Sequence, residues 1–302
     1  MDKKVLITGA SGLLGRDVTR VFLADKTWST LGLAFSRSGG DLDLRKCDVT
    51  DRDQVEAVVR EFRPTVILHS AAERRPAVVT VQEEKTKTLN VLATQILCEL
   101  AQEVGAYVLF ISTGAVFDGS EPPYFPTDPP NPVSRYGISK AEGEKAVMES
   151  SPDNVVLRVP LLFGKVESLD ESSVTSLLLK VKNSGTPALI DHRKQRFPTW
   201  TLDLANAVKI LVDARSQNPE LTGYFHWSGA EMMTKYEMSM AMAEVFGMRC
   251  SHIEAVTDGH QHQHRQFINS HLVSRRMETL AGATKRTPFK IAIKECLKDF
   301  IV

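Results

Sequence analysis

The sequence has few cysteines and no long apolar run. Four cysteines occur among 302 residues, and no two of them form a CxxC pair. This scarcity excludes a disulfide framework and a cysteine-rich zinc site, and it fits a reducing compartment. No apolar segment reaches the about 20 residues that span a bilayer, and the apolar run at residues 5–7 is too short for a secretory signal. We therefore expect a soluble, cytoplasmic protein.

The chain also lacks a net charge. Lys plus Arg equals Asp plus Glu at 37 each, so no overall field attracts the protein to nucleic acid or to an anionic membrane. Hydrophobic residues make up 42% and charged residues 25%, which is ordinary globular usage. We expect a sizeable core and neither nucleic acid nor membrane as a partner.

The N-terminal half alternates short β-branched runs with helical patterns, which is typical of βαβ units on a parallel sheet. The expected strands cover residues 4–8, 30–35, 65–69, 107–112 and 155–159. The expected helices cover residues 13–24, 51–62, 83–104 and 136–149. We predict an α/β fold, with a doubly wound parallel sheet of the Rossmann kind over residues 1–160.

After residue 160 the alternation weakens. Helical patterns remain at residues 174–183, 201–214, 234–246 and 290–300. They predict a smaller α/β lobe over residues 161–302, with some exchange of chain between the two parts. Six prolines between residues 118 and 132 predict a loop over the sheet.

A glycine-rich turn connects the first strand to the first helix. Glycine allows a tight turn, a close approach of backbone to a pyrophosphate, and contact between helix and strand. The start of the helix presents free N–H groups to phosphates. A merely structural turn is the alternative, but the position after a first strand favours a dinucleotide site. The residues of this turn are Gly9, Ser11, Gly12, Leu13, Leu14 and Gly15.

The end of the second strand indicates which nicotinamide cofactor binds. An acid at this position binds the ribose 2′-OH of NAD. This chain has Ser36 and Arg37 there, and a guanidinium beside a hydroxyl suits a 2′-phosphate. We therefore predict NADP(H), with an exposed loop arginine as the alternative.

A phenol and an ammonium form the candidate chemical site. Tyr136 and Lys140 are four residues apart and share one helix face, while Thr113 ends a strand at the carboxyl edge of the sheet. A nearby ammonium favours the phenolate, so Tyr136 could exchange a proton with a substrate that Thr113 hydrogen-bonds. Two surface residues at this spacing are the alternative for the pair.

Together these motifs resemble the extended short-chain dehydrogenase/reductase family, over essentially the whole chain. The resemblance implies that Asp48 and Val49 flank the adenine and that Asn90 supports the catalytic end. It also implies contacts to the pyrophosphate, the ribose and the nicotinamide edge. Those contacts are assigned to Ser70, Ala71 and Ala72 and to Val159, Pro160, Leu161 and Leu162.

The run TGAVFDG at residues 113–119 is similar to the STDYVFDG pattern of the dTDP-4-dehydrorhamnose reductase branch. Gly114 and Ala115 replace an acid and an aromatic residue, which argues against rapid turnover of a sugar nucleotide. If a sugar nucleotide binds, Arg75, Gln195 and Arg196 are the expected pocket residues, because guanidinium groups bind phosphates in bidentate fashion.

Other runs resemble the family of regulatory beta subunits of methionine adenosyltransferase. They are AAERRP at 71–76, QRFPT at 195–199, FHWSG at 225–229, MTKYEM at 233–238 and RTPF at 286–289. The resemblance implies an NADP-binding protein that associates with the catalytic subunit, with Thr113, Tyr136 and Lys140 as a vestigial site. An active NADPH-dependent reductase is the alternative.

Two further features depart from that family. The final residues 300–302 stand where relatives continue into a basic, aromatic tail, so we expect the folded surface to carry partner contacts. Residues 266–269 read QFIN where the reductase branch has an Arg-Pro pair before the Asn.

The alternating His260, His262 and His264 invite a metal site, but they fall in an expected loop with nothing to fix their orientation, and we predict no metal.

Overall fold

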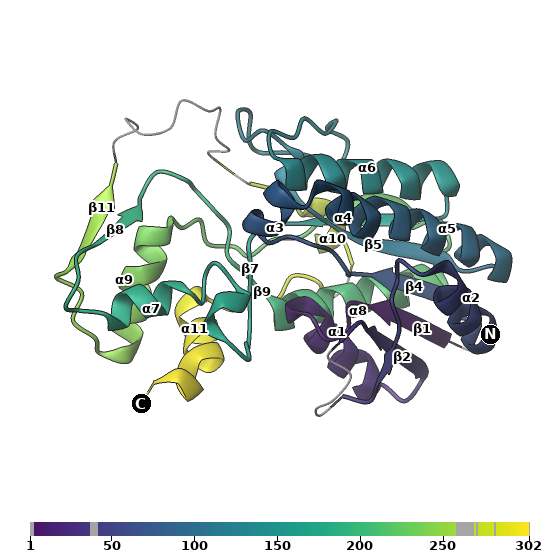
Figure 1. The fold of residues 1–302 in the computed structure, drawn as a ribbon, viewed down its shortest axis with the longest axis horizontal. Coiled ribbons are helices and arrows are strands. Elements are labelled where there is room, and N and C mark those ends of the chain that lie inside the picture. The colour runs from purple at the N-terminus through teal and green to yellow at the C-terminus, as the bar shows by residue number, and fades with distance from the viewer. Residues whose placement is uncertain (1–2, 37–41, 258–268, 270, 281, 302) are drawn as a thin grey trace.

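The computed structural model describes residues 3–36, 42–257, 269, 271–280 and 282–301. A larger part contains a seven-stranded sheet, and a smaller part of short helices and strands lies beside it (Figure 1). The strand order is β10-β6-β5-β4-β1-β2-β3, and all of these strands pair in parallel. This confirms the predicted doubly wound fold.

The seven strands are short, and most are buried along their length. They are β1 Lys3–Thr8, β2 Trp28–Ala34, β3 Leu44–Lys46, β4 Val66–His69, β5 Tyr107–Thr113, β6 Val155–Val159 and β10 Gly223–His226. In β1, Val5 and Ile7 pack into the core on one face, and Leu6 packs into the core on the other. Apolar side chains on both faces require helices on both sides, which explains the nearly continuous apolar strands.

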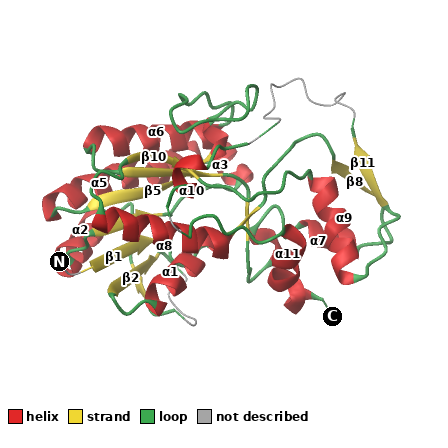
Figure 2. Ribbon diagram, turned by 180° about the vertical axis from the view of Figure 1, so that it is seen from behind, coloured by secondary structure: helices red, strands yellow, loops and turns green. Residues whose placement is uncertain are grey.

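Two layers of helices cover the sheet (Figure 2). One layer contains α1 Leu13–Ala24, α8 Thr201–Gln217 and the short α10 Arg275–Glu278. The other contains α2 Arg52–Phe62, α5 Ala93–Val104 and α6 Arg135–Ser150. Next to that second layer lie α3 Pro76–Val81, α4 Glu83–Lys87 and a π-helical turn over Thr88–Leu92.

A side-chain cap begins α2. The Asp51 carboxylate accepts hydrogen bonds from the backbone N–H groups of Asp53 and Gln54, and the Gln54 amide donates to Asp51 at 2.6 Å. The expected helix over residues 83–104 is a continuous helical run that contains the π-helical turn. The loop predicted for residues 118–132 contains neither helix nor strand.

After residue 160 the chain passes between the two parts more than once. The smaller part contains α7 Leu177–Lys182, α9 Lys235–Phe246, α11 Phe289–Leu297, the strand pair β8 Ala188–Asp191 and β11 Ile253–Val256, and the 3-10 turn Lys298–Phe300. Between the parts lie the paired strands β7 Leu162–Phe163 and β9 Thr199–Trp200. The 3-10 turn Leu169–Glu171 follows β7, and its Leu169 packs against the core of the smaller part. In contrast, α8 and β10 return to the large sheet, where β10 is an edge strand beside β6.

Within the described part of the chain, no helix combines the length and the apolar character needed to cross a membrane.

Candidate functional site

The glycine turn after β1 is held by contact of backbone on backbone. Gly9 has a φ of +66°, a region that favours glycine. A Cβ atom on Gly15 would lie 2.0 Å from the Gly9 carbonyl oxygen, and one on Gly9 would lie 2.7 Å from the Ala71 backbone nitrogen. Gly12 precedes α1, and no side chain caps this helix. The turn therefore offers a close backbone surface and free N–H groups, which fit a pyrophosphate.

The other residues assigned to the phosphates and ribose lie beside this turn. The Ser70 hydroxyl donates to the Thr8 carbonyl at 2.7 Å, and the Ala71 N–H donates to the Thr8 hydroxyl at 3.3 Å. These bonds fix the segment after β4 against the end of β1. Ala72 follows this segment and is half-buried, as are Ser11 and Leu13 in the glycine turn, while Leu14 is buried.

The structure describes some of the residues expected around the adenine and the 2′-phosphate. The Asp48 carboxylate accepts hydrogen bonds from the backbone and hydroxyl of Thr50 at 2.9 and 2.7 Å, and Val49 is buried. Ser36 is exposed at the end of the second strand. Arg37, on which the choice of NADP depends, lies outside the described residues.

Thr113 and Tyr136 meet at the carboxyl edge of the sheet. Burial raises the pKa of Tyr136 to about 12, and the charge of Arg74 and a hydrogen bond with Thr113 oppose this rise. Burial lowers the pKa of Lys140 to about 7, against the opposing charge of Glu144. At neutral pH the phenol therefore keeps its proton.

Lys140 lies deeper than Tyr136 on α6. Its ammonium nitrogen is 3.7 Å from the centroid of the Phe110 ring, and the side chain is buried. Arg74, in the loop between β4 and α3, is a cation whose charge acts on Tyr136. The expectation that Lys140 favours the Tyr136 phenolate is therefore not met, because burial dominates the pKa of Tyr136 and the charge that opposes it comes from Arg74. The spacing of Tyr136 and Lys140 gave no sign of this second cation.

Asn90 connects the loop after β4 to the helix of Tyr136. Its carboxamide accepts from the Glu73 N–H at 2.8 Å and donates to the Glu73 carbonyl and the Ser139 hydroxyl, both at 3.0 Å. The Ser139 hydroxyl donates in turn to the Tyr136 carbonyl at 2.9 Å. These hydrogen bonds join the loop after β4 to α6, the helix that carries Tyr136. Asn90 lies in the π-helical turn, a distortion that occurs often at functional sites.

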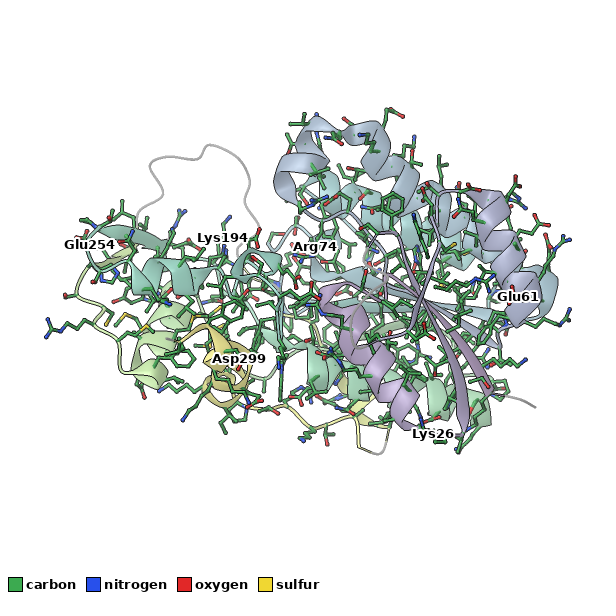
Figure 3. All side chains as sticks on the ribbon, turned by 60° about the horizontal axis from the view of Figure 1, so that its bottom comes forward. Lys26, Glu61, Arg74, Lys194, Glu254 and Asp299 are labelled. Carbon is green, nitrogen blue, oxygen red and sulfur yellow. The ribbon has the colours of Figure 1, made fainter. Side chains whose placement is uncertain are left out.

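A set of polar contacts near the glycine turn connects the two parts. Arg74 donates to the Glu171 carbonyl, and the Glu171 carboxylate pairs with Arg16 at 2.6 Å. Arg16 also donates to the Ser11 carbonyl at 3.0 Å and is buried. Figure 3 labels Arg74 where the two parts meet. The sequence analysis did not predict these contacts, because Arg16 and Glu171 are 155 residues apart.

The residues expected to bind a substrate are dispersed. Arg75 is exposed and pairs with Glu73 at 2.6 Å. The side-chain Oε1 of Gln195 accepts from the Asn269 side-chain amide at 2.8 Å, and Arg196 pairs with Asp191 at 3.1 Å. Gln195 and Arg196 therefore belong to the smaller part, and none of their described contacts reaches Arg75.

The segment expected at the nicotinamide edge follows β6. Val159 ends this strand, and Val159 and Pro160 are buried. Leu161 and Leu162 are half-buried, and Leu162 begins β7, where it pairs with Thr199 of β9. The segment therefore leads from the carboxyl edge of the large sheet to the connection between the two parts.

A buried ion pair lies behind the chemical centre, and sequence reasoning did not find it. Arg158 in β6 donates to both carboxylate oxygens of Glu144 at 2.8 to 3.2 Å, and the Ser112 hydroxyl donates to Glu144 at 2.5 Å. The Arg158 guanidinium lies 3.4 Å from His226 in β10. Burial, assisted by the Arg158 charge, lowers the pKa of His226 to about 3. The network connects β5, α6, β6 and β10.

Among the residues that the structure describes, no group of three potential metal ligands comes together. The three alternating histidines lie outside them, as does the run at 266–268.

Comparison with known proteins adds to this geometry. The family profile described as RmlD substrate binding domain matches residues 3–302. Methionine adenosyltransferase 2 subunit beta from Bos taurus is 43% identical over 301 residues, which cover 100% of this chain and 89% of the relative.

Sugar reductases are similar at lower identity. A dTDP-4-dehydrorhamnose reductase from Aggregatibacter actinomycetemcomitans is 29% identical over 245 residues, covering 79% of this chain and 78% of the relative. The crystal structure of a dTDP-4-dehydrorhamnose reductase from Bacillus anthracis, in complex with NADP, superimposes with a TM-score of 0.83 at 22% identity. It covers 99% of this chain and 100% of its own, and it shows the same fold.

Proposed function

Because this chain belongs to the RmlD substrate binding domain family, with beta subunits of methionine adenosyltransferase among its relatives, we propose that it is an NADP(H)-binding regulatory subunit of that enzyme. The observation that carries the proposal is the 43% identity to such a subunit over the full chain. In this role the protein binds the catalytic subunit in the cytoplasm and modulates the synthesis of S-adenosylmethionine.

We assign the cofactor to residues 1–160 and the partner or substrate surface to residues 161–302. The glycine turn and the start of α1 would hold the pyrophosphate. Asp48 and Val49 would border the adenine, Ser36 and Arg37 the 2′-phosphate, and Pro160 and Leu162 the nicotinamide. When bound, NADP(H) supplies a hydride or accepts one.

The state of the chemical centre supports regulation over catalysis. Burial raises the pKa of Tyr136 to about 12 and lowers the pKa of Lys140 to about 7, so neither value matches the other. Gly114 and Ala115 also provide no acid or aromatic side chain beside Thr113. A general acid works best when its pKa lies near the working pH.

An active NADPH-dependent sugar-nucleotide reductase is the second candidate, since Thr113 and Tyr136 do meet at the carboxyl edge. In that case Thr113 would hydrogen-bond the substrate oxygen, and Tyr136 would donate the proton. Assays of NADPH oxidation with dTDP-4-dehydro-6-deoxysugars separate the two candidates. Turnover near the enzyme median of about 10 per second, lost in Tyr136→Phe, would support the reductase.

The regulatory proposal is tested by mixing purified chain with a methionine adenosyltransferase catalytic subunit. S-adenosylmethionine formation is followed against methionine concentration, with NADPH present and absent. We expect co-elution and altered kinetics that persist in Tyr136→Phe. No co-elution and no kinetic change at micromolar protein would overturn the assignment.

The cofactor assignment has its own test. NADPH should bind about tenfold more tightly than NADH, equivalent to about 1.4 kcal/mol, because a guanidinium pairs with the 2′-phosphate. Calorimetry on Arg37→Ala should show this preference abolished. An unchanged preference would remove Arg37 from the site.

A further inference from the structure

A second concave site lies at the edge of the large sheet. It is a hollow of about 560 Å³, and none of its lining residues belongs to the cofactor segments. Three separate segments form its walls. They are the loop residues Phe125, Pro126 and Thr127, Tyr224 of β10, and Val273, Arg275 and Arg276 at the start of α10. Hollows of 300–1,000 Å³ that are mostly apolar and carry a few polar groups are typical of small-molecule sites.

The walls of this hollow are held by specific hydrogen bonds. The Tyr124 N–H donates to the His271 carbonyl at 2.9 Å, and the Val273 N–H donates to the Tyr124 carbonyl at 2.8 Å. The Phe125 N–H donates to the Asp128 carboxylate at 2.7 Å. The proline-rich loop is therefore fixed against the segment before α10, and the hollow is formed before any ligand arrives.

The hollow is positively charged. The Arg276 guanidinium stacks on the Phe225 ring at 3.9 Å, and burial lowers its pKa. The Arg275 side chain is exposed, and no side-chain hydrogen bond or ion pair among the described residues involves it. None of the residues that line the hollow is acidic. The exposed Arg275 guanidinium beside an apolar surface complements an anion that has an apolar body.

The edge of the sheet at this position is blocked to an added strand. Arg276 donates to the carbonyls of Tyr224 and Thr222, each at 2.8 Å, and so occupies acceptors that a pairing peptide would need. With an added strand excluded, the hollow fits a compact ligand that places a ring against Phe125 and Tyr224. The Phe125 side chain is 50% exposed, which leaves its ring available for stacking.

We propose that this hollow binds a small aromatic carboxylate, whose ring packs between Phe125 and Tyr224 and whose carboxylate pairs with Arg275. The site is separate from the cofactor and goes beyond the regulatory function. Because the loop at residues 118–132 leads directly into α6, a ligand here would also stabilise the segment that precedes Tyr136.

The test uses the full chain with naphthoate as probe and naphthalenemethanol as its neutral counterpart, measured by calorimetry. Naphthoate should bind about tenfold more tightly than the alcohol, and Arg275→Gln should remove this difference. Phe125→Ala should weaken both probes. Arg249→Gln and Leu189→Ala change exposed residues elsewhere and should leave binding unaltered.

Saturating NADPH should not displace naphthoate, because the two sites share no residue. Displacement by NADPH, equal binding of the two probes, or unchanged affinity in Arg275→Gln would overturn the proposal. Selective binding of an acidic, tryptophan-containing peptide with no binding of naphthoate would also overturn it. All variants should keep the melting temperature of the wild type, since Phe125 and Arg275 are exposed.

Discussion

The glycine turn and the helix that carries Tyr136 face the same edge of the sheet, yet they are built in different ways. At the glycine turn, backbone lies against backbone, and a single Cβ atom on Gly15 would overlap the Gly9 carbonyl. Behind Tyr136, charged side chains are buried together, with Glu144 and Arg158 each 1% exposed. The glycine turn requires residues without a side chain, whereas the region behind Tyr136 requires that the Glu144 and Arg158 charges neutralise each other.

This difference determines how each region responds to substitution. A backbone contact has no flexible atoms that can move away, so any side chain shifts the turn itself. A buried ion pair is most sensitive to the loss of one partner, because the remaining charge stays desolvated. Removing both charges together should lower the free energy of unfolding by less than removing one of them.

The buried pair should give the largest effect. Arg158→Met leaves the Glu144 carboxylate without its bidentate partner, so we expect a loss of about 3–5 kcal/mol in the free energy of unfolding. The double variant Glu144→Leu/Arg158→Met should recover most of this loss, since no charge remains buried. Urea unfolding measures both. A single variant within about 1 kcal/mol of wild type would contradict the argument.

The glycine turn should respond next. Gly15→Ala displaces the Gly9 carbonyl, and NADPH affinity should fall at least about a hundredfold, or about 2.7 kcal/mol. Gly114→Ala is the matched control, because its nearest contact would be an ordinary 3.6 Å from the Leu272 side chain. Calorimetry on both variants decides the point. Equal affinities would show that the turn does not approach the cofactor.

Lys140 should make stability depend on pH in an unusual direction. Its pKa is lowered to about 7 in the folded chain from 10.5, so between these values the unfolded chain binds the extra proton. Stability should therefore rise with pH in this window, by about 2 kcal/mol from pH 7 to 9 relative to Lys140→Met. Urea unfolding of both proteins across this range provides the measurement. Parallel curves would place the ammonium in a solvated position.

The exposed pair Arg75–Glu73 should matter least for stability. Its guanidinium is largely solvated, and exposed pairs contribute about 0–1 kcal/mol. Arg75→Ala should therefore leave the melting temperature nearly unchanged. Arg16→Met is the informative comparison, because Arg16 is buried against Glu171 and should be distinctly more costly to remove.

The sequence predicted the parts of the fold that repeat a local pattern. Apolar runs and helical periods located five strands of the sheet and the helices between them, because burial on both faces leaves a clear signal. It missed β3, which is three residues long and ends in Arg45-Lys46, and β10, which lies far along the chain. Short strands are selected by their neighbours in space, which a local pattern does not reveal.

In the candidate site, too, features formed by neighbouring residues could be predicted, and features formed by distant segments could not. The glycine turn could be predicted because Gly9, Gly12 and Gly15 lie close together in the sequence, directly after the first strand. In contrast, Arg16 and Glu171 are 155 residues apart, and Arg158 and His226 are 68 residues apart. The Tyr136–Lys140 spacing identified a shared helix face, but the depth of Lys140 depends on Phe110 of another strand. Contacts between distant segments require the fold itself.

The return of the chain to the large sheet has a consequence for biosynthesis. The apolar side chains of Val18 and Phe22 in α1 are covered by Leu204, Val208 and Leu211 of α8, which are made almost 200 residues later. A nascent chain that ends near residue 160 therefore presents this face uncovered to its surroundings. Such transiently exposed surface favours aggregation. The ribosome must thus deliver most of the chain before the first helix is protected, and a truncated N-terminal half should precipitate unless α8 is supplied.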